Sequence, residues 1–426
     1  MRSIAQTKTI AQSNGDGNTQ SDSQHSIYMK RAIELARKGA GWTAPNPMVG
    51  AVIVKDGRVI GEGYHEKCGQ LHAERNAIAS LTESAEGATM YVTLEPCCHY
   101  GKTPPCTEAI VEQRIARVFI GSRDPNPLVA GKGVTFFREH GVEVIEDFMR
   151  TECDDLNPVF FHYITTKSPY VVMKYAMTLD GKIATRTGAS QWITGETARA
   201  HVQTLRGRYA SILAGIGTVL ADDPLLNCRR EGAHQPLRII VDSRLRIPLD
   251  SRILQTAGEY PTLIVCAANI DSPAEADISA VDQNAASAVA DRASAIRSCG
   301  AEVISLPGGN GRVSMKLLME YLGKRQIDSV LVEGGGEIHE ACREAGIVNH
   351  ICCYIAPKLL GGAGAKTPVE GLGSETMEDA TLLSTPAITL LGEDILLECD
   401  VKQTKRRKEA ASCLPESLKK SASSDT

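Results

Sequence analysis

The fold of this chain is decided by the stretch 72–106, which opens with His72-Ala73-Glu74 and closes with Glu95-Pro96-Cys97-Cys98-His99-Tyr100-Gly101-Lys102-Thr103-Pro104-Pro105-Cys106. One imidazole and two separated thiolates can hold a tetrahedral zinc ion whose fourth position stays open. A carboxylate two residues past the imidazole, if it does not bind the metal, can move protons. The stretch therefore predicts hydrolytic chemistry at a zinc site.

Each half of this stretch also has an ordinary explanation. A single histidine can be hydrogen-bonded beneath a helix, and two cysteines can be plain buried thiols. A purely structural zinc site would need a fourth protein ligand, which Cys98 or His99 could supply. However, Cys98 adjoins a candidate ligand, so its side chain should diverge, and Glu74 would then have no role. The two halves together favour a catalytic metal site.

The spacing of the motif points to a particular family. A His-x-Glu followed by Pro-Cys and a second Cys resembles the zinc-dependent cytidine and nucleobase deaminases, in which zinc activates water and the Glu shuttles protons. Their usual second half is Cys-x-x-Cys, whereas eight residues separate Cys97 from Cys106. This longer form resembles the riboflavin-pathway pyrimidine deaminases. The resemblance implies that His72, Cys97 and Cys106 bind Zn²⁺ and that Glu74 carries protons.

Composition narrows the function classes. The chain has 426 residues, enough for two or three domains, with 42% apolar residues and a net charge of -5. Aromatic residues make up 4%, and the sequence has no basic stripe with stacking aromatics, so we expect no nucleic-acid partner. No apolar run reaches membrane-spanning length. The thirteen cysteines are scattered and odd in number, which predicts free and metal-bound thiols in a reducing, cytoplasmic compartment.

Both ends of the chain are polar. Residues 1–26 are rich in Gln, Ser, Asn, Gly and Thr and lack the apolar core of a secretory signal. Residues 402–426 carry Lys405-Arg406-Arg407-Lys408 and a Ser-rich end. We expect both tails to be disordered.

Hydrophobic periodicity predicts an α/β arrangement in the first half. Met29, Ala32 and Ala36 recur at helical spacing, and Asp56-Gly57 joins two runs typical of a β-hairpin. The expected elements, in order, are a helix at 27–38, strands at 49–54 and 59–64, a helix from about 72, a strand at 89–94, a helix at 107–116, a strand at 118–121, a helix near 136–139 and a strand at 142–146. This order agrees with the cytidine-deaminase-like α/β/α sandwich.

The deaminase resemblance also implies which residues of this half contact substrate. Asn46 lies in Ala44-Pro45-Asn46-Pro47 and Asn126 in Asp124-Pro125-Asn126-Pro127, and both offer amide groups suited to a pyrimidine edge. The side chain of Lys102 offers a cation for a phosphate. The implied substrate contacts are Asn46, His65, Lys102, Asp124 and Asn126. Taken alone, Asn-Pro pairs are more often turn formers.

The second half predicts a mainly parallel sheet with crossover helices, because short apolar runs alternate with helical or turn-rich stretches. The runs lie at 170–177, 210–214, 237–242, 262–267 and 329–333, with antiparallel strands at 348–356, 387–391 and 394–399. The triplet Gly334-Gly335-Gly336 precedes a helix around 338–345. Its backbone amides are therefore free to receive a phosphate, although a glycine triplet alone is also an ordinary tight turn. An Ala-rich and Ser-rich insertion covers 267–298.

Several segments of this half together resemble the pyrimidine reductase of riboflavin synthesis, a relative of dihydrofolate reductase. These segments are Lys174, 190–194, 218–225 and 241–244. The resemblance implies that NADPH contacts Ala176, Trp192, Thr218, Asp222, Ser243, Gly335 and Gly336, although we expect a Gly where Ala176 stands. It implies substrate contacts at Ser190, Arg206, Leu226, Arg229 and Glu333, with Lys174 catalytic. Arg206 and Arg229 could clamp a ribose phosphate as forks, and Lys174 with Glu333 could move protons around the sugar carbonyl carbon.

The combined resemblance, over residues 27–397, is to the bifunctional deaminase-reductases of riboflavin biosynthesis. It implies a zinc deaminase domain at 27–150, a linker at 151–168 and an NADPH-dependent, dihydrofolate-reductase-like domain at 169–401. The expected substrate is a small pyrimidine ribose-phosphate, which is first deaminated and then reduced from ribosyl to ribityl. The alternatives are a deaminase of another nucleobase fused to a reductase-like domain, and a binding or regulatory homologue with one activity lost. We also expect a homo-oligomer, for which the apolar run 351–355 offers a pairing surface.

Overall fold

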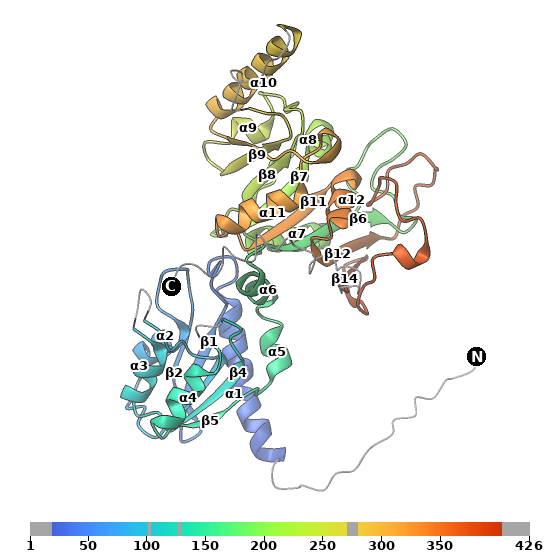
Figure 1. Cartoon of the computed structure of the whole chain (residues 1–426). Coiled ribbons are helices and arrows are strands. Elements are labelled where there is room, and N and C mark those ends of the chain that lie inside the picture. Colours follow the sequence, from blue (N-terminus) through green and yellow to red (C-terminus); the bar gives the residue numbers. More distant parts are fainter. Residues whose placement is uncertain (1–18, 101–103, 127–128, 271–279, 403–426) are drawn as a thin grey trace, which may run out of the picture. The chain divides into compact units, whose positions relative to one another are not determined.

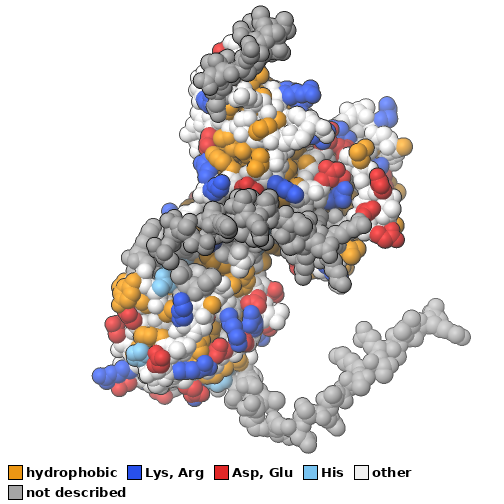
Figure 2. Space-filling view, in the orientation of Figure 1, with side chains coloured by type: hydrophobic (Ala, Val, Ile, Leu, Met, Phe, Trp, Pro, Cys, Tyr) orange, Lys and Arg blue, Asp and Glu red, His pale blue; other side chains and the backbone are white. Residues whose placement is uncertain are grey.

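The computed structural model describes residues 19–100, 104–126, 129–270 and 280–402. The chain divides into two compact units, Met1–Asn157 and Pro158–Thr426 (Figure 1). Among the described residues, no helix is both long and apolar enough to cross a membrane. On the face of the molecule that Figure 2 shows, Lys and Arg side chains are interspersed with Asp and Glu.

The first unit is built on a five-stranded sheet in the order β2-β1-β3-β4-β5. β1 is antiparallel to β2 and β3, whereas β3, β4 and β5 run parallel. The strands are β1 (Gly50–Lys55), β2 (Arg58–Tyr64), β3 (Thr89–Leu94), β4 (Arg117–Ser122) and β5 (Glu143–Ile145). The helices are α1 (Thr19–Arg37), α2 (Ala73–Ala79), α3 (Cys106–Glu112), α4 (Lys132–Glu139) and α5 (Arg150–Asp154).

Helices cover both faces of this sheet (Figure 1). Met29, Ala32 and Ala36 of α1 pack with Val52 of β1 and Cys153 of α5 in one buried cluster. The helices α2, α3 and α4 lie on the other face. Alternate strand residues are therefore buried on each side, which explains why the strands read as nearly continuous apolar runs.

The beginning of α1 differs from the sequence expectation. Disorder was expected over 1–26, but the helix begins at Thr19, and residues 1–18 lie outside the described part. Although this segment is polar, His25 makes tertiary contacts with the sheet. Nδ1 of His25 lies 2.6 Å from the hydroxyl of Tyr91, and the imidazole stacks on Phe119 with 4.5 Å between ring centroids. The end of the expected tail is thus held against the sheet.

The expected linker at 151–168 is also largely helical. It contains most of α5 and all of α6 (Pro158–Thr166), and the two units divide between these helices. Cys153 of α5 is fully buried, and the hydroxyl of Tyr163 on α6 donates a hydrogen bond to the carbonyl oxygen of Gly323. Each helix is therefore part of the unit next to it. The expected C-terminal tail, apart from Lys402, lies outside the described residues.

The second unit contains a nine-stranded sheet in the order β10-β9-β8-β7-β11-β6-β12-β14-β13. In this spatial order, every strand from β10 through β12 runs parallel to its neighbours in that group. β14 is antiparallel to β12, and β13 is antiparallel to β14 at the edge of the sheet. The bounds are β6 (Tyr170–Thr178), β7 (Ser211–Gly215), β8 (Leu237–Val241), β9 (Thr262–Cys266), β10 (Glu302–Ser305), β11 (Ser329–Gly334), β12 (Val348–Ala356), β13 (Ala387–Leu391) and β14 (Asp394–Asp400).

Helices again form a layer on each face of this sheet. On one side lie α7 (Glu196–Arg208), α8 (Ile216–Asp222), α9 (Arg252–Gln255) and α10 (Ala280–Ser298). On the other side lie α11 (Met315–Lys324) and α12 (Gly336–Ala345). Two short 3₁₀ helices cover Gly309–Gly311 and Met377–Asp379. Most of the expected insertion is thus α10, while residues 271–279 lie outside the described part.

The apolar run 351–355 does not form an edge. It belongs to β12, which pairs with β6 on one side and with β14 on the other. Its backbone groups are therefore used inside the sheet, and the run is apolar because the strand is interior. The expectation that it pairs across a subunit interface was wrong.

Candidate active sites

The first candidate site lies where three loop-to-element junctions of the first unit meet. His72 is the residue directly before α2, Cys97 follows β3 in the loop, and Cys106 is the first residue of α3, after Pro105. An extended residue before a helix directs its side chain away from the helix axis, and the rigid Pro104-Pro105 pair sets where α3 begins. Residues far apart in sequence are thereby brought to one point.

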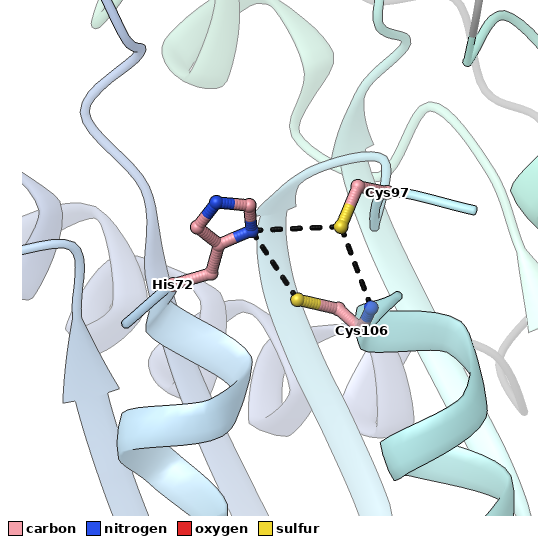
Figure 3. A group of neighbouring side chains, drawn as sticks. All are labelled: His72, Cys97 and Cys106. Atoms are coloured by element: carbon pink, nitrogen blue, oxygen red, sulfur yellow. Dashed lines mark hydrogen bonds between the residues drawn. The ribbon is translucent and has the colours of Figure 1, made fainter. Parts of the chain in front are cut away.

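The three side chains point toward one another (Figure 3). Nδ1 of His72 lies 3.5 Å from the sulfur of Cys97 and 3.4 Å from the sulfur of Cys106. Tetrahedral zinc bonds of about 2.0 Å to nitrogen and 2.3 Å to sulfur separate neighbouring ligand atoms by about 3.5 Å. The separations from His72 to both sulfurs therefore match those around a tetrahedral zinc ion. Neither Cys98 nor His99 belongs to this group of potential ligands within the described residues.

The surroundings favour one ionised thiol. A hydrogen bond from the Cys106 thiol lowers the pKa of Cys97 to about 4. Burial raises this pKa, whereas the hydrogen bond and charge of His72 lower it further. The backbone N–H of Cys106 also donates to the Cys97 sulfur at 3.4 Å. That N–H is in the first turn of α3, where unpaired amides stabilise negative charge. The negative charge on this sulfur therefore favours the binding of a cation.

Glu74 stands in the first turn of α2 with only 3% of its surface exposed. Burial raises the pKa of its carboxyl group above the usual range. Glu74 is not one of the clustered ligand residues. A buried carboxyl group beside an open metal position can hold or release a proton without binding the metal.

Close packing fixes α2 against the sheet. A Cβ atom at Gly63 of β2 would lie 2.4 Å from the backbone nitrogen of Ala77, so only glycine permits this approach of helix and strand. Arg75 holds the other side of the site, because its Nη2 donates to the carbonyl oxygens of Pro104 and Pro105, both at 2.9 Å. Arg75 thus ties the helix of Glu74 to the loop that carries Cys106. Arg75 was not predicted as a functional residue, although it adjoins the motif.

Asn46 and His65 lie beside the metal ligands, as the resemblance implied. The imidazoles of His65 and His72 are 5.5 Å apart between centroids. Nδ1 of His65 faces the carbonyl oxygen of Leu71 at 3.0 Å, so it must carry the proton, and Nε2 accepts from the Asn46 amide nitrogen at 3.3 Å. This pairing leaves the amide oxygen of Asn46 to accept a hydrogen bond from a ligand.

Asp124 and Asn126 form the other rim. A side-chain oxygen of Asp124 accepts from the backbone N–H of Asn126 at 2.8 Å, and burial raises the pKa of Asp124 to about 6. Lys102, the expected phosphate contact, lies outside the described residues.

Glu95 supports this rim and was missed as a functional residue. It is 4% exposed, and its two oxygens accept from the backbone N–H groups of Gly131, at 3.1 Å, and Gly133, at 3.2 Å. A Cβ atom at Gly133 would lie 2.7 Å from the carbonyl oxygen of Pro96. The carboxylate therefore joins the metal-binding loop to the beginning of α4. Its position directly before Pro96-Cys97 was the only signal in the sequence.

The second candidate site lies at the carboxyl ends of the parallel strands in the second unit. Lys174 is on β6, Thr218 follows β7, Ser243 follows β8, and Glu333 is the penultimate residue of β11. In open α/β sheets this edge is where ligands bind. The parallel pairing of these strands therefore brings together most of the residues that the sequence analysis singled out.

Glu333 and Arg206 form a buried ion pair at this edge. Nε and Nη2 of Arg206 donate to the two oxygens of Glu333 at 2.7 and 2.8 Å. Burial opposes ionisation of Glu333, but the charges of Arg206 and Lys174 lower its pKa to about 2. The fork of Arg206 was expected to clamp a phosphate, whereas here it holds Glu333. Arg229, which is exposed, keeps its side chain available.

Lys174 occupies an unusual environment for an amine. Burial lowers its pKa, while the charge of Glu333 opposes that shift. Its ammonium group lies 5.7 Å from the ring centroid of Tyr354, whose hydroxyl lies 2.7 Å from Nδ1 of His201. Neither Tyr354 nor His201 was expected from the sequence, because the pairing of β6 with β12 is not visible there.

The expected cofactor residues form smaller groups along the same edge. The backbone N–H of Gly335, which precedes α12, donates to the Thr218 hydroxyl at 3.2 Å. A Cβ atom at Gly336 would lie 2.5 Å from the Glu370 side chain, so the turn needs glycine. The N-terminus of this ten-residue helix can receive a phosphate, and the donor set fits a dinucleotide.

The remaining expected residues are placed as follows. The Ser190 hydroxyl donates to Asp222 at 2.9 Å, and the Ser243 hydroxyl accepts from the backbone N–H of Val313. Trp192 is 60% exposed, with the guanidinium of Arg199 over its ring at 4.7 Å. Two residues do not offer a polar side chain: Ala176 packs against the core on β6, and Leu226 is buried with φ +50°.

Two sequence models of known families match the chain. One, described as the cytidine and deoxycytidylate deaminase zinc-binding region, matches residues 22–122. The other, described as the RibD C-terminal domain, matches residues 169–397, more than half of the chain. These matches confirm the expected fold class for each unit. They also agree with a zinc site in the first unit and an NADPH site in the second.

Curated relatives and solved structures agree over almost the whole length. The chain is 52% identical to riboflavin biosynthesis protein RibD of Actinobacillus pleuropneumoniae, over 87% of this chain and 94% of the relative. It is 43% identical to the RibD protein of Bacillus amyloliquefaciens, over 89% and 96%.

Two solved structures have the same arrangement. RibD of Acinetobacter baumannii superposes with a TM-score of 0.75 at 36% identity, over 90% of this chain and 100% of that one. A diaminohydroxyphosphoribosylaminopyrimidine deaminase/5-amino-6-(5-phosphoribosylamino)uracil reductase of Thermotoga maritima superposes with a TM-score of 0.76 at 36% identity, with the same coverage. With a zinc-deaminase unit, a reductase unit and relatives that align along both, the chain belongs to the RibD family of bifunctional riboflavin biosynthesis enzymes.

Proposed function

We propose that the two units act in succession on one pyrimidine ribose-phosphate. The first would convert the diaminopyrimidine that carries a phosphoribosylamino group into the corresponding aminouracil, and the second would reduce its ribosyl group to ribityl. The substrates follow the activities for which the Thermotoga maritima relative is named. The observation that carries the proposal is the convergence of His72, Cys97 and Cys106 beside the buried Glu74.

In the first unit, Zn²⁺ would act as a Lewis acid that activates water at neutral pH. The chain's own residues do the rest. Glu74, which is buried and is not one of the clustered ligand residues, takes a proton from the attacking water and delivers it to the ring nitrogen and the departing amine. Asn46, oriented by His65, accepts a hydrogen bond from a ring substituent. Asp124 and Asn126, which follow β4, would also contact the ring.

In the second unit, NADPH supplies the hydride. Thr218 and the amides around Gly335 would hold the cofactor at the beginning of α12. Lys174 and Glu333 would contact the sugar hydroxyls and move the proton that accompanies reduction. Arg206 acts through Glu333, because it fixes the position of that carboxylate. Arg229, whose side chain is exposed, would contact the substrate phosphate.

We also propose that the chain is a cytoplasmic homo-oligomer. The edge strand β13 exposes Ile388 and Leu390, which are 66% and 73% accessible. An exposed apolar edge strand is a surface that proteins normally cover. The described cysteines are all free, which agrees with a reducing compartment.

A coupled assay tests both reactions. Purified zinc-loaded protein is given the diaminopyrimidine ribosylamino phosphate, and ammonia release and NADPH absorbance are followed together. Glu74→Gln should abolish ammonia release and therefore also NADPH oxidation. Adding the deaminated product should restore NADPH oxidation in this variant, because the second site is intact.

Three other outcomes would contradict parts of the proposal. Ammonia release without NADPH oxidation would leave the second unit with another task. Ammonia from cytosine or another nucleobase, but not from the diaminopyrimidine, would favour a different deaminase. Full activity of Glu74→Gln would mean that another residue carries the protons.

A further inference from the structure

A second cluster of metal-ligating side chains lies in the second unit, on neighbouring strands. His350 and Cys352 are two residues apart on β12, so both side chains are on the same face of the sheet. Glu398 of β14 is the cross-strand partner of Cys352, and Asp400 is the partner of His350. The antiparallel register therefore places an imidazole, a thiol and two carboxylates in one compact square.

The three donor atoms lie close enough to share an ion. One ligand atom each from His350, Cys352 and Glu398 all lie within 4.8 Å of one another. Nε2 of His350 is 3.8 Å from the nearer Glu398 oxygen, and the Cys352 sulfur is 3.9 Å from the same oxygen. A tetrahedral zinc ion needs separations of about 3.3 to 3.6 Å. The two separations to the Glu398 oxygen exceed this range by only a few tenths of an ångström.

The fourth residue gives the histidine the orientation that metal ligands have. Nδ1 of His350 lies 2.8 Å from an oxygen of Asp400, which leaves Nε2 directed toward Glu398. In metal sites, a ligating histidine usually donates its other N–H to a carboxylate in this way. A cross-strand ion pair would need only His350 and one carboxylate, and it would not explain why a buried thiol adjoins them.

Access and burial also suit a bound ion. Cys352 is 1% exposed, whereas the side chains of His350 and Glu398 are 20% and 34% exposed. The sulfur therefore lies at the bottom of the cluster, and an ion can enter from the solvent side. Water can complete the coordination there, as it does at zinc sites with three protein ligands.

We propose that His350, Cys352 and Glu398 form a second transition-metal site that takes Zn²⁺, with Asp400 orienting His350. This site is separate from the deaminase centre, which is in the other unit. The ion would join β12 to β14 and so fasten the antiparallel strands to the parallel part of the sheet. Because Cys352 is also paired with Lys174 of β6, the ion would stiffen the strand next to the reductase site.

Zinc stoichiometry of the full-length protein tests the proposal. The protein is loaded with Zn²⁺, dialysed to remove weakly held ions, and measured by plasma mass spectrometry. We expect about two zinc ions per chain in the wild type and about one in either His72→Ala or Cys352→Ala. The double variant should hold almost none. A wild type with one zinc ion, or a Cys352→Ala protein with two, would overturn the proposal.

Cys353→Ala is the matched control. Cys353 is also buried on β12, but it faces the other side of the sheet, toward Tyr175. It should keep both ions. If Cys352→Ala does not fold by circular dichroism, His350→Gln replaces it, because this partly exposed position tolerates the change better.

Cobalt gives an independent readout that needs no activity. In a Cys97→Ser, Cys106→Ser background, which removes both thiols of the first site, Co²⁺ should produce a thiolate charge-transfer band that comes from Cys352. Adding Cys352→Ser should remove that band. If the band persists after this third substitution, another thiol binds the cobalt and the assignment is wrong.

Discussion

Replacing Glu333 by glutamine should cost the second unit about 3 kcal/mol of folding free energy at neutral pH. The pKa of Glu333 falls from 4.5 to about 2 in the folded protein, and a difference of about 2.5 pKa units corresponds to about 3 kcal/mol. The side chains of Arg206 and Glu333 are only 14% and 5% exposed, so solvent screens the pair little. Removing one partner of a buried pair costs about 3 to 5 kcal/mol, which agrees.

The pH dependence of this loss has a definite sign. Because the folded pKa of Glu333 lies below its unfolded value, its contribution is complete above about pH 4.5 and is lost as the pH falls toward 2. The difference in stability between wild type and Glu333→Gln should therefore be constant from pH 7 to about pH 5. Below about pH 5 the difference in stability should shrink.

Tryptophan fluorescence can isolate the second unit in the full chain. The sequence has two tryptophans, Trp42 in the first unit and Trp192 in the second. In a Trp42→Phe background, urea unfolding followed at Trp192 reports the second unit. The control is Glu344→Gln on the exposed side of α12, which should change stability by less than about 0.5 kcal/mol. A loss below about 1 kcal/mol for Glu333→Gln, or one that does not shrink in acid, would refute the reasoning.

Three further changes test other parts of the structure. Gly63→Ala should displace α2, because its Cβ would lie 2.4 Å from a backbone nitrogen. The deaminase kcat should therefore fall while NADPH oxidation of the deaminated product is unchanged. An equal loss of both activities would contradict this prediction. Removing zinc with a chelator should abolish ammonia release, and re-addition of Zn²⁺ should restore ammonia release. Asp328→Asn should stabilise the second unit at pH 7 by up to about 3 kcal/mol. Burial raises the Asp328 pKa to about 6, so the wild type loses stability as the pH rises from about 4 through 6. The urea midpoints of the wild type and Asp328→Asn should therefore converge near pH 4.

The deaminase ligands could be predicted from the sequence because their signal is local. His72 precedes a helix and Cys97 lies in the loop after a strand, so each half of the motif is visible within a few residues. The same holds for the glycines before α12. These short-range patterns, with the family resemblance that they carry, were sufficient for the fold class of both units.

The rest depends on pairing between distant segments. Arg206 and Glu333 are 127 positions apart, and nothing near either residue predicts their pairing. The order of nine strands, which makes β12 interior, is likewise set by packing that no local pattern encodes. The first turns of α1 were missed for the same reason, because His25 is held by Tyr91 and Phe119.

The double hydrogen bond of Glu95 limits how the deaminase half can be re-engineered. A designer who wishes to change the accepted pyrimidine would naturally exchange the segment between β4 and α4, since it carries Asp124 and Asn126. That segment is attached to the metal loop through Gly131 and Gly133. A donor segment without these two glycines, or one of different length before α4, would pull on Cys97. A workable graft must therefore include Glu95, both glycines and their spacing as one transferable block.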